Sequence, residues 1–224
     1  DYPDPEQAFA LVERLPAGTW YKVGLELFTR AGPPVVERLI DQGRHVFLDL
    51  KLNDIPNTEA GAVSGPAALC VLLLSIHASG GEDMLRAAAH AAAVGSKHGG
   101  GDMRLLAISV LTSLDDTGIR SVMGDEASVA STVARLARLA LRSGVDGVVS
   151  SVAECRAVKE ECGPDFLVVT PGIRLAGDAA QDQKRVATPA VARDAGADYL
   201  VVGRSITQAD DPAAALKRVR DEIG

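Results

Sequence analysis

Short apolar runs alternate with amphipathic segments along the whole chain, and this alternation restricts the possible folds more than any other feature. The runs are rich in Val, Leu and Ile and are mostly bounded by Gly, Pro, Asp or Ser, as is typical of strands. The predicted strands are Trp20–Val23, His45–Leu50, Val71–His77, Leu105–Leu111, Gly147–Ser150, Phe166–Thr170 and Tyr199–Val202. Strands that alternate with helices favour a parallel sheet.

The segments between the runs predict helices. The clearest is Ser128–Arg142, where apolar residues recur at helical spacing. The least favoured is Thr58–Leu69, because Gly61, Gly65 and Pro66 all oppose a helix. The other predicted helices are Pro5–Leu15, Pro33–Gln42, Glu82–Ala93, Val152–Cys162, Thr188–Ala195 and Pro212–Glu222.

Seven strands and eight helices in alternation predict a TIM-type (β/α)8 barrel, an α/β fold in which each strand is followed by its helix. The series begins with a helix, so the first strand of the barrel would precede Asp1 and be missing from this sequence. A length of 224 residues suits one barrel domain over residues 1–224. A doubly wound open sheet is the alternative, but no Gly-x-Gly-x-x-Gly follows the first predicted strand.

Composition excludes several classes of function. The chain has 23 Lys and Arg against 30 Asp and Glu, so its overall field does not favour nucleic acid or an anionic membrane. Three cysteines without a Cys-x-x-Cys spacing predict neither a disulfide framework nor a zinc site, and indicate reduced thiols in the cytoplasm. The longest apolar run, Ala67 to Ile76, is too short to span a bilayer.

Charged residues lie at the ends of the first two predicted strands, where a barrel carries its chemistry. Because side chains alternate along a strand, Asp49 and Lys51 are expected to enter the barrel mouth together. One such pair could merely plug the barrel end, since structural ion pairs also lie in clefts. Two further charges, Lys22 and Asp54, favour a functional site instead.

A lysine among carboxylates is held in its charged form and is a poor Schiff-base nucleophile. It is a good proton donor and a good counter-charge for a carbanion. We therefore interpret Lys51 as an acid that neutralises negative charge on a substrate carbon.

Two segments near the C-terminus indicate a phosphorylated small molecule. Gly203 and Arg204 follow the last predicted strand, at a position where barrels often bind phosphate. The loop from Pro171 to Gln183 is long for its kind. It is either a solvated surface loop or a lid that closes over the ligand, with Arg174 and Gln183 as polar contacts.

The segment Asp49-Leu-Lys51-Leu-Asn-Asp54-Ile-Pro-Asn-Thr58 resembles the signature of the orotidine 5′-phosphate decarboxylase family in its bacterial form. The resemblance extends over essentially the whole chain, in matching order and spacing. It includes Tyr21–Phe28, Ile76–Gly81, Leu111–Ser113, Thr170–Arg174, Asp182–Pro189 and Val202–Thr207.

The resemblance implies a barrel that works as a homodimer and converts orotidine 5′-phosphate to UMP and carbon dioxide, in pyrimidine biosynthesis, without metal or organic cofactor. In this family pattern Lys51 protonates the pyrimidine carbon, and Asp49 lies near the departing carboxylate. Asp54 reaches the neighbouring subunit's site, and Lys22 completes the charged array.

The resemblance also implies a set of substrate-binding residues, none of them a metal ligand. Asp1 corresponds to an aspartate that binds ribose, Lys22 also contacts the ribose, and Thr112 corresponds to a polar contact near the base. The remaining implied contacts, in the signature and in the later loops, are Asp49, Asp54, Ile55, Thr58, Pro171, Arg174, Gln183, Gly203 and Arg204.

Two alternatives stay open at this stage. One is a metal-dependent barrel enzyme similar to hexulose-phosphate synthase, which needs a carboxylate at an earlier strand end; Glu26 is present but misplaced for that role. The other is an inactive barrel that only binds a phosphorylated ligand. The complete set of Lys22, Asp49, Lys51 and Asp54 argues against the inactive barrel.

Overall fold

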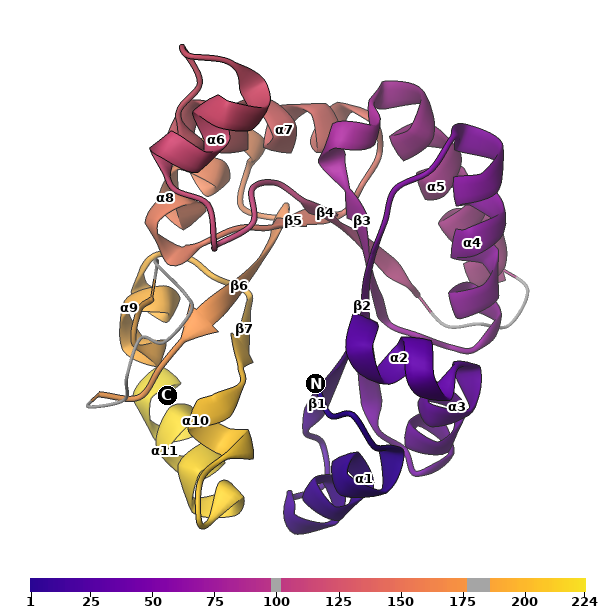
Figure 1. The fold of residues 1–224 in the computed structure, drawn as a ribbon, viewed down its shortest axis with the longest axis vertical. Helices are drawn as coiled ribbons and strands as arrows, with labels where there is room; N and C mark the ends of the chain where they lie inside the picture. The colour runs from indigo at the N-terminus through magenta and orange to yellow at the C-terminus, as the bar shows by residue number, and fades with distance from the viewer. Residues whose placement is uncertain (98–101, 177–185) are drawn as a thin grey trace. The chain divides into compact units, whose positions relative to one another are not determined.

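The computed structural model describes residues 1–97, 102–176 and 186–224 (Figure 1). Its strands are β1 (Trp20–Gly24), β2 (His45–Leu52), β3 (Leu73–His77), β4 (Arg104–Ile108), β5 (Gly147–Val149), β6 (Leu167–Ile173) and β7 (Tyr199–Val202). They lie in one sheet in the order of the sequence. All seven predicted strands are therefore confirmed, with shifted ends, and the further strand expected before Asp1 stays a prediction.

Helices connect the strands. They are α1 (Pro5–Arg14), α2 (Leu25–Ala31), α3 (Pro33–Asp41), α4 (Pro56–Ala68), η1 (Ala78–Gly80), α5 (Glu82–Lys97), α6 (Asp116–Met123), α7 (Val129–Arg142), α8 (Val152–Cys162), α9 (Pro189–Asp194), α10 (Arg204–Thr207) and α11 (Pro212–Ile223). No helix in the described segments is both long and apolar enough to cross a membrane.

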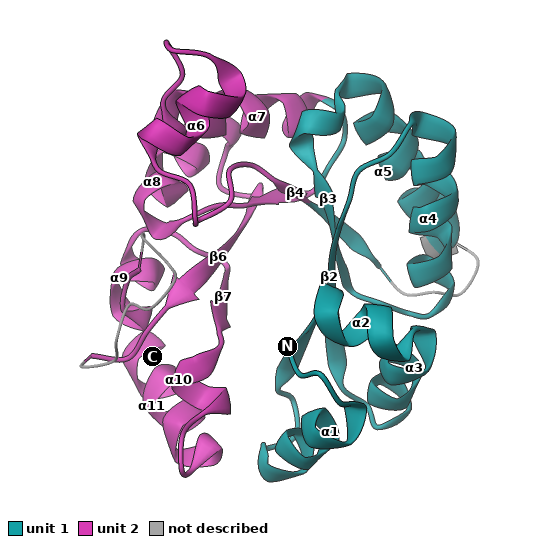
Figure 2. Ribbon diagram, viewed as in Figure 1, with its two compact units in different colours: residues 1–106, 143–145 teal, residues 107–142, 146–224 magenta. Residues whose placement is uncertain are grey.

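The chain divides into two compact units (Figure 2). Unit 1 holds residues 1–106 and 143–145, and unit 2 holds residues 107–142 and 146–224. The prediction of a single domain over residues 1–224 stays a prediction.

Unit 1 is built on parallel pairing of β1 with β2 and of β2 with β3. The register places Gly24, the last residue of β1, opposite Asp49 of β2. Leu48, Leu74 and Ile76 are fully buried and form part of the core between this sheet and its helices. Because parallel strands end at one edge, the residues after β1, β2 and β3 are brought to the same edge of unit 1.

Helix α4 is the element that the sequence favoured least, yet it forms over Pro56–Ala68. Pro56 stands in its first turn, where a missing N–H costs nothing, and Pro66 falls in its last turn. Tertiary packing stabilises α4 despite its low helix propensity. Ala67 is fully buried, and a side chain on Gly95 of α5 would collide with it.

Unit 2 pairs β5 with β6 and β6 with β7, again in parallel. Just beyond β4, the Ser109 N–H donates to the Val149 carbonyl at 3.3 Å, so this segment lies beside β5. At the opposite strand ends Lys159 of α8 donates to two carbonyls and to Asp198, whose Oδ2 is 2.7 Å away. This lysine ties α8 to the starts of β6 and β7.

Two helices were not expected from the sequence. Helix α2 has Gly24 as its N-cap, without a side-chain hydrogen bond, and buries only Leu27, so it carries neither a cap signal nor a long apolar stripe. Helix α6 buries only Ile119, although Asp115 caps it by accepting from the Gly118 N–H. The short helix α10 begins directly after Gly203, which is its N-cap.

Candidate active site

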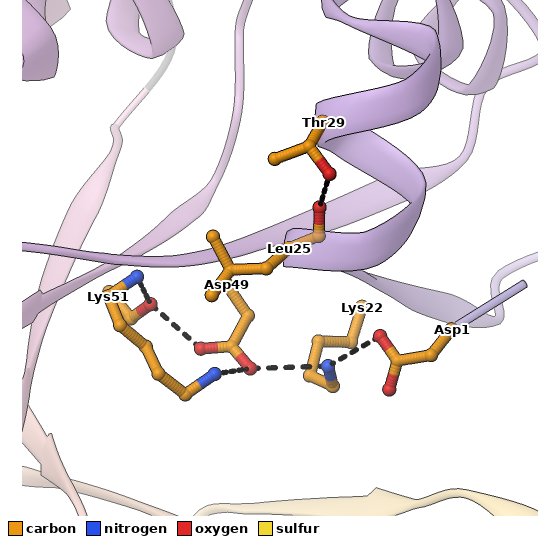
Figure 3. Close-up of polar contacts among 7 residues, drawn as sticks. Asp1, Lys22, Leu25, Thr29, Asp49 and Lys51 are labelled. Carbon is orange, nitrogen blue, oxygen red and sulfur yellow. Dashed lines mark hydrogen bonds and ion pairs between the residues drawn. The ribbon is translucent and has the colours of Figure 1, made fainter. Parts of the chain in front are cut away.

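A charged array lies at the carboxyl ends of β1 and β2, entirely within unit 1 (Figure 3). The Asp49 Oδ2 atom lies 2.7 Å from Lys51 Nζ and 3.2 Å from Lys22 Nζ. Lys22 Nζ in turn lies 3.7 Å from Asp1 Oδ1. The structure therefore brings together Asp1, Lys22, Asp49 and Lys51, four residues that the sequence singled out.

Glycine at position 24 leaves room for this array. A Cβ at Gly24 would collide with the Asp1 carboxylate and would lie 3.1 Å from Lys22 Nζ. The last residue of β1 must therefore lack a side chain for the Asp1–Lys22 pair to take the observed position.

The end of β2 is irregular, so the regular alternation from which the contact of Asp49 with Lys51 was predicted is interrupted there. Leu48 pairs with Leu74 and Leu52 with Ile76, so three residues of β2 stand against the single residue Ser75 of β3. Within this bulge Lys51 has a φ of 52°, a left-handed conformation that is uncommon for a residue with a side chain. Asp49 and Lys51 meet as predicted, but the bulge takes part in their placement.

Asp49 is 6% exposed and is held as a carboxylate. Burial alone would raise its pKa, but the ammonium groups of Lys22 and Lys51 and hydrogen bonds from Lys51 and Ser75 outweigh burial, and the pKa of Asp49 lies below its ordinary value. Its two oxygens are both engaged, Oδ2 by the two lysines and Oδ1 by the Ser75 hydroxyl at 2.8 Å.

Ser75 was not found by sequence reasoning. It is completely buried in β3, and its Oγ accepts the backbone N–H of Lys51 at 2.9 Å while donating to Asp49. Its only signal in the sequence is that of a lone hydroxyl inside the apolar run that becomes β3.

Asp54 does not join the array in the described part of the chain. It is exposed, and its Oδ1 accepts from the Ile55 N–H at 2.7 Å. Its own N–H donates to Oε2 of Glu59, a fully buried residue of α4 that sequence reasoning also missed. Burial, together with the nearby charge of Asp54, raises the pKa of the Glu59 carboxyl despite this hydrogen bond.

Ile55, the N-cap of α4, is 67% exposed, and Thr58 in the first turn of α4 is exposed as well. His77, which ends β3, is half-buried, and burial and the charge of Lys51 lower its pKa.

The other predicted contacts belong to unit 2. Thr112, Pro171, Gly203 and Arg204 are all partly buried. Pro171 lies in β6, and Arg204 begins α10 directly after Gly203. Gln183 lies outside the described residues.

Arg174 is 7% exposed, an unusual position for an arginine. Its Nη1 donates to the carbonyl of the preceding Ile173 at 3.0 Å, and its backbone N–H donates to Ala187 at 3.0 Å. Its buried Nε has no hydrogen-bond partner in the described segments, and no carboxylate there pairs with it. Arg174 is thus a buried cation of unit 2 whose Nε–H donor has no partner in the described residues.

The described residues contain no group of three or more His, Cys, Asp or Glu side chains that could hold a metal ion. Glu26, considered above as a ligand, lies in α2 and faces Arg30 at 4.0 Å.

A family model described as "Orotidine 5'-phosphate decarboxylase / HUMPS family" matches residues 1–219. The chain belongs to this family. Two similar proteins are both named orotidine 5'-phosphate decarboxylase. That of Alcanivorax borkumensis is 50% identical over 194 residues, which cover 86% of this chain and 81% of the relative. That of Moorella thermoacetica is 48% identical over 196 residues, which cover 86% and 77%.

A solved member of the orotidine 5′-phosphate decarboxylase family has the same fold. The crystal structure of orotidine 5'-phosphate decarboxylase from Lactobacillus acidophilus matches with a TM-score of 0.89 at 37% identity, covering 100% of this chain and 96% of that one. The fold class predicted from the sequence, an α/β barrel of TIM type, is confirmed by this likeness.

Proposed function

We propose that the chain is an orotidine 5′-phosphate decarboxylase, which releases carbon dioxide from orotidine 5′-phosphate to form UMP in pyrimidine biosynthesis, without a cofactor. Membership of the family and the names of its relatives support the reaction. The observation that carries the proposal is the placement of Lys51 Nζ against the buried Asp49, with Lys22 on the other side of the same oxygen.

The proposed step balances without an outside oxidant or reductant. The bond between the pyrimidine carbon and its carboxylate breaks, and the electron pair stays on the ring carbon. The Lys51 ammonium gives a proton to that carbon, so a C–H bond forms and the amine regains its proton from water. The nearby ammonium also stabilises the negative charge as it develops, which is where catalysis requires the stronger interaction.

Asp49 keeps the lysines in place for this step. With Oδ2 between two ammonium groups and Oδ1 on Ser75, the carboxylate has a fixed orientation before any substrate arrives. Preorganised charge needs no reorganisation during the reaction. This use of Asp49, as a counter-ion of lysines, differs from the metal ligation that the hexulose-phosphate synthase alternative requires.

Substrate binding is proposed for the residues that the family resemblance implies. Asp1 and Lys22 would bind the ribose, while Ile55, Thr58, Thr112 and Pro171 would contact the nucleotide. Arg174, Gln183, Gly203 and Arg204 would bind the phosphate and the base and form the lid. Arg174 supports this assignment, since a buried guanidinium with an unused Nε suits an anion.

A direct assay tests the proposal. We expect the purified chain to change the ultraviolet absorbance of orotidine 5′-phosphate and to form UMP and carbon dioxide, with the same rate in the presence of a metal chelator. A rate that the chelator abolishes and divalent metal restores would favour the metal-dependent alternative. Tight binding of the nucleotide with no product would favour the inactive barrel.

The proposal includes a homodimer in which Asp54 serves the neighbouring subunit's site. The exposure of Asp54 and its separation from the array within this chain support that role. Mixing inactive Lys51→Ala and Asp54→Ala variants tests it, because a mixed dimer would contain one site with both residues intact. Recovered activity is expected, and no recovery after subunit exchange would place Asp54 in its own chain's site.

The proposed location is the cytoplasm. The three cysteines form no disulfide, and Cys155 is buried, with a pKa raised by burial to about 12. Such thiols suit a reducing compartment. Fractionation of the source cells is the measurement that checks it.

A further inference from the structure

The bulge in β2 interrupts the regular backbone pairing between β2 and β3. Asp49, Leu50 and Lys51 stand opposite Ser75 alone, so the regular succession of backbone pairs is interrupted. Lys51 adopts a positive φ at this point. A non-glycine residue keeps such a conformation only where its surroundings hold it.

The Ser75 side chain fills the gap. Its Oγ accepts the Lys51 N–H at 2.9 Å, in place of a ladder carbonyl. A hydroxyl can donate one hydrogen bond, and that of Ser75 donates to Asp49 Oδ1 at 2.8 Å. The other Asp49 oxygen contacts Lys51 Nζ at 2.7 Å, so the contacts form a closed ring from the Lys51 backbone through Ser75 and Asp49 to the Lys51 side chain.

We propose that Ser75 is a positioning residue for the reaction, whose hydroxyl sets the placement of the Lys51 ammonium by holding both the Lys51 backbone and the Asp49 carboxylate. This inference rests on the proposed function, because Lys51 is the acid of that reaction. Ser75 itself touches no reacting atom and acts through its two neighbours.

Burial makes the hydroxyl hard to replace. Ser75 has no exposed surface, so water does not reach its place when the hydroxyl is removed. The Lys51 N–H and Asp49 Oδ1 would then both be left without this partner, and an unmade hydrogen bond to a buried charge is costly. The charged or titratable groups that also face Asp49 are Lys22 on β1, Lys51 on β2 and His77 on β3.

Kinetics of Ser75 variants as a function of pH test the inference in the full chain. We expect Ser75→Ala to lower kcat by about tenfold or more while KM changes little. The acidic limb of the profile of kcat against pH should move to higher pH in Ser75→Ala, because Asp49 loses a hydrogen-bond donor that favours its ionised form. Ser75→Thr keeps the hydroxyl and should keep the wild-type limb, even if its extra methyl group lowers the thermal midpoint.

Thr19→Val is the matched control. Thr19 is also buried in unit 1, directly before β1, and its hydroxyl donates to the Pro16 carbonyl at 2.8 Å. It should alter stability alone. A wild-type kcat and acidic limb in Ser75→Ala would overturn the inference, as would Ser75→Thr shifting the limb as far as Ser75→Ala.

A second measurement separates this inference from the proposed function. The carboxyl carbon of Asp49, followed by carbon-13 NMR during an acid titration, should titrate at higher pH in Ser75→Ala than in wild type. That readout needs no turnover, so wild type that fails to decarboxylate the nucleotide would refute the function and leave the titration to judge Ser75. Identical titrations refute the inference. If Ser75→Ala does not fold, Ser75→Cys, with a weaker donor of similar size, replaces it.

Discussion

The two units of the chain carry charge in opposite ways. In unit 1 the charged groups neutralise one another: Asp49 holds Lys22 and Lys51, and Lys22 also contacts Asp1. In unit 2 the buried Arg174 has no carboxylate partner within the described residues and donates only to neighbouring backbone through Nη1. The array in unit 1 thus pairs its charges with one another, whereas Arg174 in unit 2 has a buried Nε without a partner in the described residues.

This difference fits the two tasks of the proposed reaction. Bond breaking requires groups that are fixed before the substrate arrives, and mutual pairing fixes them. A phosphorylated nucleotide supplies an anion, and a buried guanidinium such as Arg174, without a carboxylate partner in the described residues, gains most from one. The comparison predicts that changes at Asp49 and Lys51 act mainly on kcat, whereas changes at Arg174 act mainly on KM.

Removing the proposed acid should have the largest effect. We expect Lys51→Ala to lower kcat by at least about a thousandfold, because the variant loses both the proton donor and the ammonium that stabilises the carbanion. Steady-state decarboxylation kinetics measure it. Lys217→Ala is the control, since the exposed Lys217 of α11 pairs with Asp221 on the same helix. Undiminished turnover in Lys51→Ala would remove the basis of the proposed mechanism.

Neutralising the carboxylate should come second. We expect Asp49→Asn to lower kcat by about a hundredfold or more, because two ammonium groups then face a neutral amide. The effect on stability depends on pH. The folded-state pKa of Asp49 is depressed, so its stabilisation is present above the unfolded pKa and is lost as pH falls through the folded pKa.

Denaturant unfolding of Asp49→Asn and wild type at several pH values checks this dependence. The stability difference between the two proteins should shrink in strong acid. Asp221→Asn, an exposed aspartate on α11, serves as the control. A difference that stays constant with pH would mean that Asp49 is not held as a charged partner of the lysines.

Truncating Arg174 tests the other side of the comparison. We expect Arg174→Ala to raise KM by about ten- to a hundredfold, the value of a charge-assisted hydrogen bond, with a smaller change in kcat. Arg138→Ala, which removes an exposed arginine of unit 2 that pairs with Glu161, should leave KM unchanged. A fall in kcat with constant KM would contradict the assignment of substrate binding to Arg174.

The sequence predicted the strands and the charged residues but not the means of holding them. Asp49 and Lys51 were recognisable because charges end an apolar run, and their contact is confirmed at 2.7 Å. The backbone conformation that produces this contact could not be predicted, because strict alternation gives no sign of a bulge or of a positive φ at Lys51. Ser75 was missed because it accepts the backbone N–H of Lys51, which is distant in the sequence. Glu59 was missed because its hydrogen bond with the Asp54 N–H is known only from the fold.

Helix α4 and Gln183 mark two other limits of sequence reasoning. The glycines and proline of α4 weaken its propensity, and only packing against α5, which needs the fold, explains why it forms. The roles of the binding residues came from resemblance to a family. One of these residues, Gln183, lies outside the described part of the chain. Those roles stay predictions until kinetics of the variants are measured.

The smallest expected effect concerns Glu59, a buried carboxyl in unit 1 outside the array. Its folded-state pKa is raised, so its contribution to stability is greatest below the unfolded pKa and is lost as pH rises through the folded pKa. We therefore expect Glu59→Gln to match wild type in acid and to exceed it by about 1 kcal/mol near neutrality, since the amide carries no charge to bury. The amide oxygen still accepts the Asp54 N–H, so turnover should persist. Unfolding of both proteins at acidic and neutral pH measures the gain, with the exposed Glu160→Gln as control. An equal stability difference at both pH values would show that the unpartnered Oε1 atom, and not the charge of Glu59, determines its effect.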